Sequence, residues 1–370
     1  MTPVVDLHAL SRRQRWLVFL AVAALLIALP FAVDAFLGRT WVRIIDVALL
    51  FIMLALGLNI VVGFAGLLDL GYIAFFAVGA YSYALLASPQ FGIHGPFLLL
   101  LPLGALVAAV FGTLIGAPTL RLRGDYLAIV TLGFGEITRI FLNNLNRPVN
   151  ITNGPQGITL IDPLQAGGFA LSKTYTLGGL TVAPVHSYYF VFLACALLSI
   201  LISLRLEDSR IGRAWIAIRE DELAANAMGI NTRNIKLLAF AMGATFGGVA
   251  GGLFASFQGF ISPESFTLLD SIMVLCMVVL GGMGNVGGVV LGAVLLTALP
   301  EALRYVGPLQ QAWFGGIYID PSDLRMLLFG LALVLMMLFR PAGLWPSTTR
   351  RRELAAEDDV ATEEQAHAAR

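Results

Sequence analysis

Residues 44–62 read IIDVALLFIMLALGLNIVV, and this stretch decides the fold class. Asp46 and Asn59 are the only polar side chains among its 19 residues. A helix of this length rises about 28 Å, close to the roughly 30 Å thickness of the hydrocarbon core of a bilayer. The stretch therefore predicts a transmembrane helix.

The composition of the whole chain is also that of a membrane protein. Of its 370 residues, 58% are hydrophobic and 12% are charged, whereas about a quarter are charged in soluble domains. Its 39 glycines are typical of membrane helices that pack closely or are interrupted. The formal net charge of zero gives no indication of nucleic-acid binding.

Ten stretches have about the length and the apolar character that a spanning helix needs. They are residues 16–33, 44–62, 70–87, 97–117, 125–142, 187–204, 237–257, 266–281, 286–303 and 323–339. The third, fifth and eighth are weak or short, so eight to eleven helices fit the sequence. We expect an all-α polytopic membrane protein with about ten transmembrane helices.

The distribution of basic residues predicts the orientation, because Lys and Arg favour the cytoplasmic side of a membrane. With the N-terminus inside, sixteen of the 23 Lys and Arg residues fall in segments on the inner side. We therefore expect a cytoplasmic N-terminus at residues 1–15, a transmembrane domain at 16–339 and an external loop at 143–186. The tail at 340–370 is expected to be cytoplasmic and, lacking apolar periodicity, disordered.

The largest predicted cytoplasmic loop, residues 205–236, contains the marks of a short helix. In the stretch DELAANAMG, Asp221 is placed to cap its start and Gly229 to end it. Four residues lie at helical spacing and would form an apolar side, namely Leu223, Ala224, Ala227 and Met228. Helices shorter than about 12–15 residues are marginal in water, so this one needs a surface to lie on. The surface is either a groove on a partner or the chain's own membrane domain; a solvated amphipathic turn is the third alternative.

Two Gly-rich stretches, GFAG at 63–66 and GGMGNVGG at 281–288, fall on the inner side of neighbouring helices. They fit interrupted helices around a translocation path, because irregular backbone at membrane depth must face protein or water. They fit tight interhelical turns equally well.

Ionisable residues inside or beside the predicted spans are costly and are therefore candidates for function. They are Asp46, Asp69, Glu136, Arg139, Asp270 and Glu301. Glu136 and Arg139 lie three positions apart on one predicted helix, as in a structural ion pair. Asp69 has two interpretations. It either lines the translocation path or a gate, or it caps a helix at the membrane interface. The candidate path or gate residues are Asn59, Gly63, Gly66, Asp69 and Glu136.

Six stretches together carry a family resemblance. They are RLRGDYLAIVTLGFGEITRI at 121–140, ITNGPQGI at 151–158, DSRIGRAWIAIREDELAANAMGIN at 208–231, SPESF at 262–266, VVLGGMGN at 278–285 and FRPAGLWP at 339–346. They resemble the LivM-type permease subunits of bacterial branched-chain amino acid ABC transporters, over roughly residues 44–346. The resemblance implies an ABC importer permease fold in the bacterial inner (cytoplasmic) membrane.

The short helix also resembles the coupling loop of bacterial ABC importer permeases, in which Glu-Ala-Ala is followed by three residues and Gly. Leu223 stands where the motif has Glu, which occurs one position earlier as Glu222, and the later Ile and Leu-Pro are missing. The resemblance implies that this loop docks on an ATPase. The expected coupling residues are Arg219, Glu222, Leu223, Ala224, Ala225, Met228 and Gly229.

The same resemblance implies the partners and the substrate. The partners would be a second permease of the LivH type, two ATP-binding subunits and a periplasmic substrate-binding protein, together with membrane lipid. The substrate would be leucine, isoleucine or valine.

The sequence itself argues against ATP hydrolysis by this chain. A phosphate-binding loop needs Gly-Lys in GxxxxGK[ST], and neither Lys173 nor Lys236, the only lysines, follows a glycine. The histidines, His8, His94, His186 and His367, show no spacing typical of metal ligands. We therefore expect no enzymatic activity, metal or cofactor.

Two alternatives remain at this stage. A related permease for urea, short amides or other amino acids would share the same scaffold. An ion-coupled secondary transporter working alone would also lack an ATP site, although the docking helix argues against it.

The predicted topology is tested by accessibility labelling in intact cells. Probes near Gly154 in the external loop should react, whereas probes near Glu222 and at both termini should be protected, because sixteen of 23 basic residues lie on the inner side in this orientation. The opposite labelling pattern would refute the topology.

Overall fold

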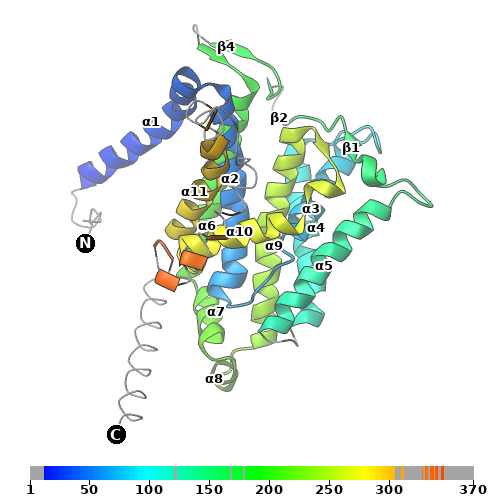
Figure 1. Cartoon of the computed structure of the whole chain (residues 1–370), viewed down its shortest axis with the longest axis vertical. Helices are drawn as coiled ribbons and strands as arrows, with labels where there is room; N and C mark the ends of the chain where they lie inside the picture. The colour runs from blue at the N-terminus through cyan, green and yellow to red at the C-terminus, as the bar shows by residue number, and fades with distance from the viewer. Residues whose placement is uncertain are drawn as a thin grey trace.

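A computed structural model describes residues 12–304 apart from positions 121, 123, 167, 168, 178 and 179, together with a few positions between 310 and 345. Its α-helices are α1 (Arg12–Leu37), α2 (Arg39–Asn59), α3 (Ile73–Leu86), α4 (Phe97–Thr119), α5 (Asp125–Asn144), α6 (Pro184–Glu207), α7 (Arg210–Glu220), α8 (Glu222–Ala227), α9 (Thr232–Gln258), α10 (Leu268–Gly281) and α11 (Val286–Arg304) (Figure 1). Three other helical turns are η1 (Ile60–Phe64), which is π-helical, and the 3-10 turns η2 (Gly154–Gln156) and η3 (Pro263–Ser265).

The all-α polytopic fold class is confirmed. Among the described residues, seven helical segments are long and apolar enough to cross a membrane: α1, α2 with η1, α4, α6, α9, α10 with η3, and α11. Helix α3 is apolar but has only 14 residues, and α5 has 20 residues but carries charged side chains. These nine coincide with the first nine predicted spans. The tenth, 323–339, lies largely outside the described residues.

Helix α2 lies at the centre of the helices, with α6, α9, α10 and α11 packed around it. Within the segment Arg39–Phe64, 89% of the most apolar stretch of 18 residues is buried inside the protein. Met53, Leu54 and Leu56 are almost fully buried, at no more than 1% exposure. A helix that is apolar on all sides is stable when protein surrounds it on all sides, so the stretch at 44–62 forms the core.

Helices α3, α4 and α9 approach one another through glycines. A Cβ atom on Gly79 of α3 would lie 2.3 Å from the backbone oxygen of Gly248 on α9, and one on Gly251 would lie 2.1 Å from that of Phe76. Contacts this short leave no room for any side chain. The abundance of glycine in the sequence thus permits close packing of helices, as expected in a membrane.

The chain is irregular between η1 and α3, over residues 65–72. Near the end of this stretch and at the start of α3, backbone N–H groups bond side chains of neighbouring helices. The N–H of Leu70 donates to Thr131 Oγ1 of α5 at 3.1 Å, and that of Ile73 donates to Ser271 Oγ of α10 at 3.1 Å. An interrupted backbone at membrane depth is stable only with such protein partners. The Gly-rich stretch at 63–66 lies where helical backbone gives way to this irregular stretch, called the interrupted segment below, which leads to α3.

The second Gly-rich stretch is a tight turn. Gly282 and Gly284 have φ values of 118° and 82°, which suit glycine, and the turn joins α10 to α11. Figure 1 shows α10 lying across α2 and α9, so the turn brings the chain back into a steep helix. The interpretation of a tight interhelical turn thus holds for this stretch.

The predicted external loop at 143–186 forms short hairpins rather than a featureless connection. Strand β2 (Gln165–Ala166) pairs with β3 (Phe169–Ala170), and β4 (Tyr175–Leu177) pairs with β5 (Leu180–Val182), both antiparallel. Strand β1 (Ile158–Thr159) pairs with β6 (Phe260–Ile261), which directly follows α9. The loop is therefore attached to the segment that leads into α10.

The glycine contacts predict a stability difference between two matched variants. Gly79→Ala forces a Cβ against the backbone of α9 and should destabilise the protein by about 1–3 kcal/mol. Gly133→Ala on α5 meets no atom within 4 Å and should be neutral or stabilising by up to about 1 kcal/mol. The measurement is the midpoint of thermal denaturation in detergent. Equal midpoints for both variants would contradict the close packing of α3 on α9.

Candidate functional site

Helix α7 fixes the loop at 205–236 to the membrane domain. Ser209 caps its start, with Oγ accepting from the N–H of Gly212 at 3.0 Å. Trp215 is fully buried, and its indole N–H donates to the backbone oxygen of Ile235 on α9 at 2.8 Å. A fully buried Trp with its N–H satisfied anchors α7 firmly.

Helix α8 has the two ends that the sequence predicts. Asp221 Oδ1 accepts from the N–H groups of Leu223 at 2.8 Å and Ala224 at 3.0 Å. Gly229 follows with a φ of 86°, a left-handed conformation that few other residues adopt. Lys236 of α9, with an 8% exposed side chain, pairs with Glu222 at 2.6 Å. These contacts hold α8 in one orientation.

In that orientation α8 presents an apolar face outward. Leu223 is 69% exposed and Met228 is 84% exposed, whereas Ala225 on the opposite side is buried. The exposed face, formed by Leu223, Ala224, Ala227 and Met228, is called the docking face below. Leu223 and Met228 therefore do not pack on the chain's own membrane domain within the described residues.

Arg219, near the end of α7, joins the loop to the end of α2. Its Nη1 donates to the backbone oxygen of Gly63 in η1 at 2.6 Å. Gly66 has a φ of 68°, and a Cβ there would lie 2.7 Å from Arg219 Cγ. Gly66 therefore lets the Arg219 side chain lie directly on the backbone of the interrupted segment.

Asn59 joins the same region to the turn between α10 and α11. Its Oδ1 accepts from the N–H of Gly284 at 2.9 Å, and its side chain is fully buried. The two Gly-rich stretches thus meet, although about 220 residues separate them in sequence. The set Asn59, Gly63, Gly66, Arg219 and Gly284 is called the inner junction below.

Asp69 does not belong to the inner junction. Its Oδ1 accepts from the N–H of Gly71 at 2.9 Å, and its Oδ2 is buried without a hydrogen-bond partner. This bond spans two residues and forms an Asx turn just before α3. Asp69 thus lies close to the helix-cap position that one of the two interpretations expected, but it bonds an N–H that precedes the first turn of α3.

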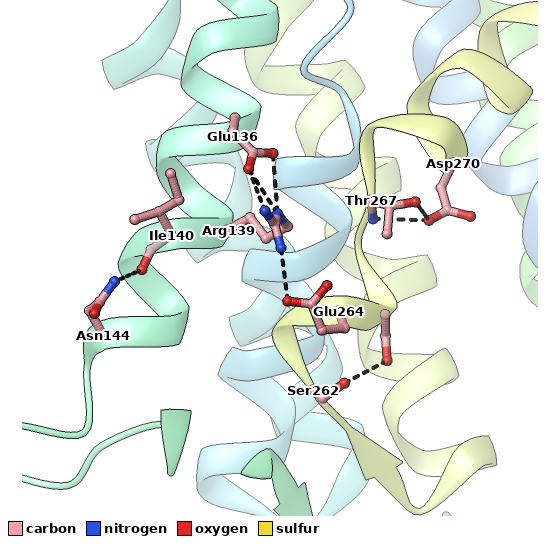
Figure 2. A network of polar contacts seen from close by, with 9 residues as sticks. Glu136, Arg139, Ile140, Asn144, Ser262, Glu264, Thr267 and Asp270 are labelled. Atoms are coloured by element: carbon pink, nitrogen blue, oxygen red, sulfur yellow. Dashed lines mark hydrogen bonds and ion pairs between the residues drawn. The ribbon is translucent and has the colours of Figure 1, made fainter. Parts of the chain in front are cut away.

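Glu136 lies in a separate site on α5 (Figure 2). Arg139 Nε donates to Glu136 Oε1 at 3.1 Å, which confirms the expected pair. Arg139 Nη1 also donates to Glu264 Oε1 of η3 at 2.9 Å. Figure 2 shows the guanidinium lying between the two carboxylates, with Thr267 and Asp270 of the next turn close by. The set Glu136, Arg139 and Glu264 is called the charged cluster below.

A cavity of about 110 Å³ lies beside the charged cluster. Its lining residues are Leu70, Ile73, Leu132, Gly135, Glu136, Phe266, Leu268 and Ser271. The lining is mostly apolar and comes from the interrupted segment, α3, α5 and α10. In the described part of the chain, no three His, Cys, Asp or Glu side chains gather into a metal site.

Comparison with known proteins identifies the family. Residues 40–337 match the family described as branched-chain amino acid transport system / permease component. The chain belongs to this family. No solved structure is significantly similar to it.

Named relatives of this permease cover most of its length. The high-affinity branched-chain amino acid transport system permease protein LivM of Escherichia coli is 43% identical over 98% of this chain and 81% of that protein. A probable branched-chain amino acid transport permease protein LivM of Methanocaldococcus jannaschii is 29% identical over 80% and 90%. The LivH permease protein of Escherichia coli is 27% identical over 79% and 90%.

The permease fold brings together only some of the predicted residues. Asn59, Gly63, Gly66 and Arg219 meet in the inner junction, while Asp69 and Glu136 lie apart from it. Gly284 and Glu264 were not among the predicted site residues, although VVLGGMGN and SPESF contain them. Their partners are 225 and 125 residues away in sequence, and no local pattern indicates such pairs.

The inner junction of the permease predicts a stability difference. Asn59→Ala leaves the buried N–H of Gly284 without its acceptor and should destabilise the protein by about 1–3 kcal/mol. Asn226→Ala on α8 removes an amide at an exposed position and should change stability by less than about 0.5 kcal/mol. Thermal denaturation measures both, and hydrogen exchange at Gly284 should accelerate only in Asn59→Ala. Unchanged exchange would contradict the contact.

Proposed function

We propose that this chain is the membrane-spanning permease subunit of an ATP-driven importer for leucine, isoleucine and valine in the bacterial inner membrane. It would work with a LivH-type permease, two ATP-binding subunits and a periplasmic binding protein, and both of its termini would be cytoplasmic. The names of its relatives support the substrate class. The observation that carries the mechanism is the docking face of α8, apolar, exposed and rigidly connected to the inner junction.

The docking face suits a groove on an ATP-binding subunit. Burying Leu223 and Met228 would contribute about 1.5–3 kcal/mol each, because both are more than two-thirds exposed in this chain. A short amphipathic helix with two apolar anchors is a common ligand of a protein groove. Here α8 already has its cap, its terminal glycine and the Lys236 pair, so little ordering free energy is lost on docking.

A movement of α8 would reach the membrane helices through identified contacts. Helix α8 follows α7 directly, and Arg219 of α7 holds the backbone of Gly63. Asn59, one turn earlier, holds the turn between α10 and α11 through Gly284. ATP-driven closure of the ATPases would therefore shift α2, α10 and α11 together and bias the path between two states.

Asn59, Gly63 and Gly66 are the proposed gate residues at the inner end of the path. The interrupted segment 65–72 begins beside Arg219 and ends at the cavity next to Glu136, where Leu70 forms part of the wall. A displacement at the inner junction would thus move the cavity wall. Asp69 holds the end of this segment in place, since its turn precedes α3.

The docking role predicts that Leu223→Asp weakens the association with the ATP-binding subunits without unfolding the chain. An unpaired carboxylate buried in an apolar groove is unfavourable by several kcal/mol, on the order of a hundredfold or more in affinity. Co-purification of the ATPase with the permease measures the effect.

Asn226→Asp is the matched control for this prediction. It adds the same charge to the same helix at a position outside the docking face, and Asn226 is itself exposed. Its ATPase retention should stay near that of the parent. Equal retention by Leu223→Asp and the parent would refute the docking face.

The energy source is tested by reconstitution in lipid vesicles. The chain alone should neither hydrolyse ATP nor concentrate leucine, because it has no Gly-Lys phosphate-binding loop. With its partner permease, ATPases and loaded binding protein, uptake should require ATP. Leucine accumulation by the isolated chain under a proton or sodium gradient would replace this proposal with secondary transport. Competition by urea, short amides and other amino acids defines the substrate range.

A further inference from the structure

We infer that the cavity beside the charged cluster is a transient binding site for the zwitterion of an amino acid with a branched aliphatic side chain. This inference rests on the proposed function and assigns the substrate-binding residues within it. The site combines a mostly apolar cavity between α5 and α10 with one charged lining residue, Glu136, which pairs with Arg139, and Arg139 in turn pairs with Glu264.

The charges match the polar end of an amino acid. Two carboxylates share one guanidinium, so the charged cluster carries one excess negative charge. The Glu136 side chain is 41% exposed and accessible to an ammonium group. Glu264 is 64% exposed and is held by a single contact to Arg139 Nη1, so a substrate carboxylate can take its place.

The size of the cavity matches the apolar side chain of such an amino acid. An apolar cavity of about 150 Å³ accommodates benzene, which has six carbons. This cavity measures about 110 Å³, and leucine and isoleucine side chains have four carbons. Leu132, Ile73 and Phe266 supply apolar walls, while Glu136 is the charged residue among the lining side chains.

The position of the charged cluster also indicates that it faces a hydrated path rather than lipid. Glu136 is the twelfth residue of the 20-residue helix α5, about 17 Å from its start and near the middle of the helix. A partly exposed carboxylate is costly in hydrocarbon but not in a water-filled path. The exposed apolar side chain of Ile137 lies about 100° around α5 from Glu136 and suits contact with lipid or a partner helix.

The site would bind weakly, as transport requires. A substrate must compete with Glu136 and Glu264 for Arg139, which is already satisfied by these intrachain contacts. Binding that is favourable enough for entry but weak enough for exit permits flux. The interrupted segment forms one wall through Leu70, so the site lies where motion of the inner junction would open or close it.

The test uses the complete transporter in proteoliposomes, with ATP and the loaded binding protein. Glu136→Gln should lower leucine uptake about tenfold, because an amide replaces the charged acceptor of the ammonium group. ATP hydrolysis stimulated by the binding protein should stay within about twofold of the parent, since coupling does not use this residue. The control is Glu301→Gln on α11. Glu301 pairs with Arg304, three residues later, at 3.0 Å, just as Glu136 pairs with Arg139. This control variant should transport leucine normally.

A second variant tests whether the size of the cavity determines which side chain is preferred. Leu132→Phe should raise the ratio of valine to leucine uptake roughly five- to tenfold relative to the parent, because it shortens the space for the longer side chain. The control Ile129→Phe makes the same type of change on α5 at a 64% exposed position and should leave the ratio unchanged.

Each outcome decides for or against the inference. Lower uptake with retained ATP hydrolysis in Glu136→Gln, or a shifted ratio in Leu132→Phe, supports it. Parental uptake and ratio in both variants overturn it, as does a parallel loss of uptake and ATP hydrolysis in Glu136→Gln without a shifted ratio. If Glu136→Gln does not assemble, the ratio in Leu132→Phe decides alone. Absence of ATP-dependent leucine uptake by the parent complex would instead refute the proposed function.

Discussion

Backbone N–H and C=O groups inside a bilayer have no water to bond, and this constraint governs the whole structure. Helices satisfy it along most of the chain. Where α2 gives way to the interrupted segment 65–72, Thr131 and Ser271 accept the freed N–H groups and Asp69 forms a local turn. The interruption is therefore tied to α5 and α10, and those two helices form the walls of the cavity.

Glycines allow the close contacts that hold these elements together. At Gly63 and Gly66 the absence of a side chain lets Arg219 and Asn59 lie against the backbone. At Gly79 and Gly251 the same absence brings α3 and α9 together. Packed elements joined by hydrogen bonds between side chains and backbone move as units, so a displacement of α7 would be passed to α2, α10 and α11 rather than absorbed locally. Tight packing thus serves both stability and the proposed coupling.

The interrupted segment connects the two sites. It starts at the inner junction, where the loop at 205–236 is attached, and ends at the cavity beside the charged cluster. A chain of direct contacts therefore runs from the docking face of α8 to the proposed substrate site. This is the arrangement that an importer needs, because energy supplied at one membrane surface must change access deep within the membrane.

Local sequence predicted the parts of this permease that local chemistry controls. The length of the apolar stretches predicted the helices, and Asp221 and Gly229 predicted the ends of α8. The spacing of Glu136 and Arg139 predicted their ion pair. Each of these features depends on residues within one helix or one turn, so periodicity and capping preferences are sufficient to find them.

Long-range contacts were decided by the tertiary structure alone. Asn59 meets Gly284 and Arg139 meets Glu264 across 225 and 125 residues, so only the packing of whole helices determines these pairs. The same packing decided that an irregular segment of eight residues follows η1, whereas a tight turn follows α10. The sequence by itself determined an all-α membrane permease with a short capped helix in the loop at 205–236. Where that helix is attached, and which charges border a cavity, depend on backbones that approach closely only in the folded chain, because glycines distant in sequence leave the space.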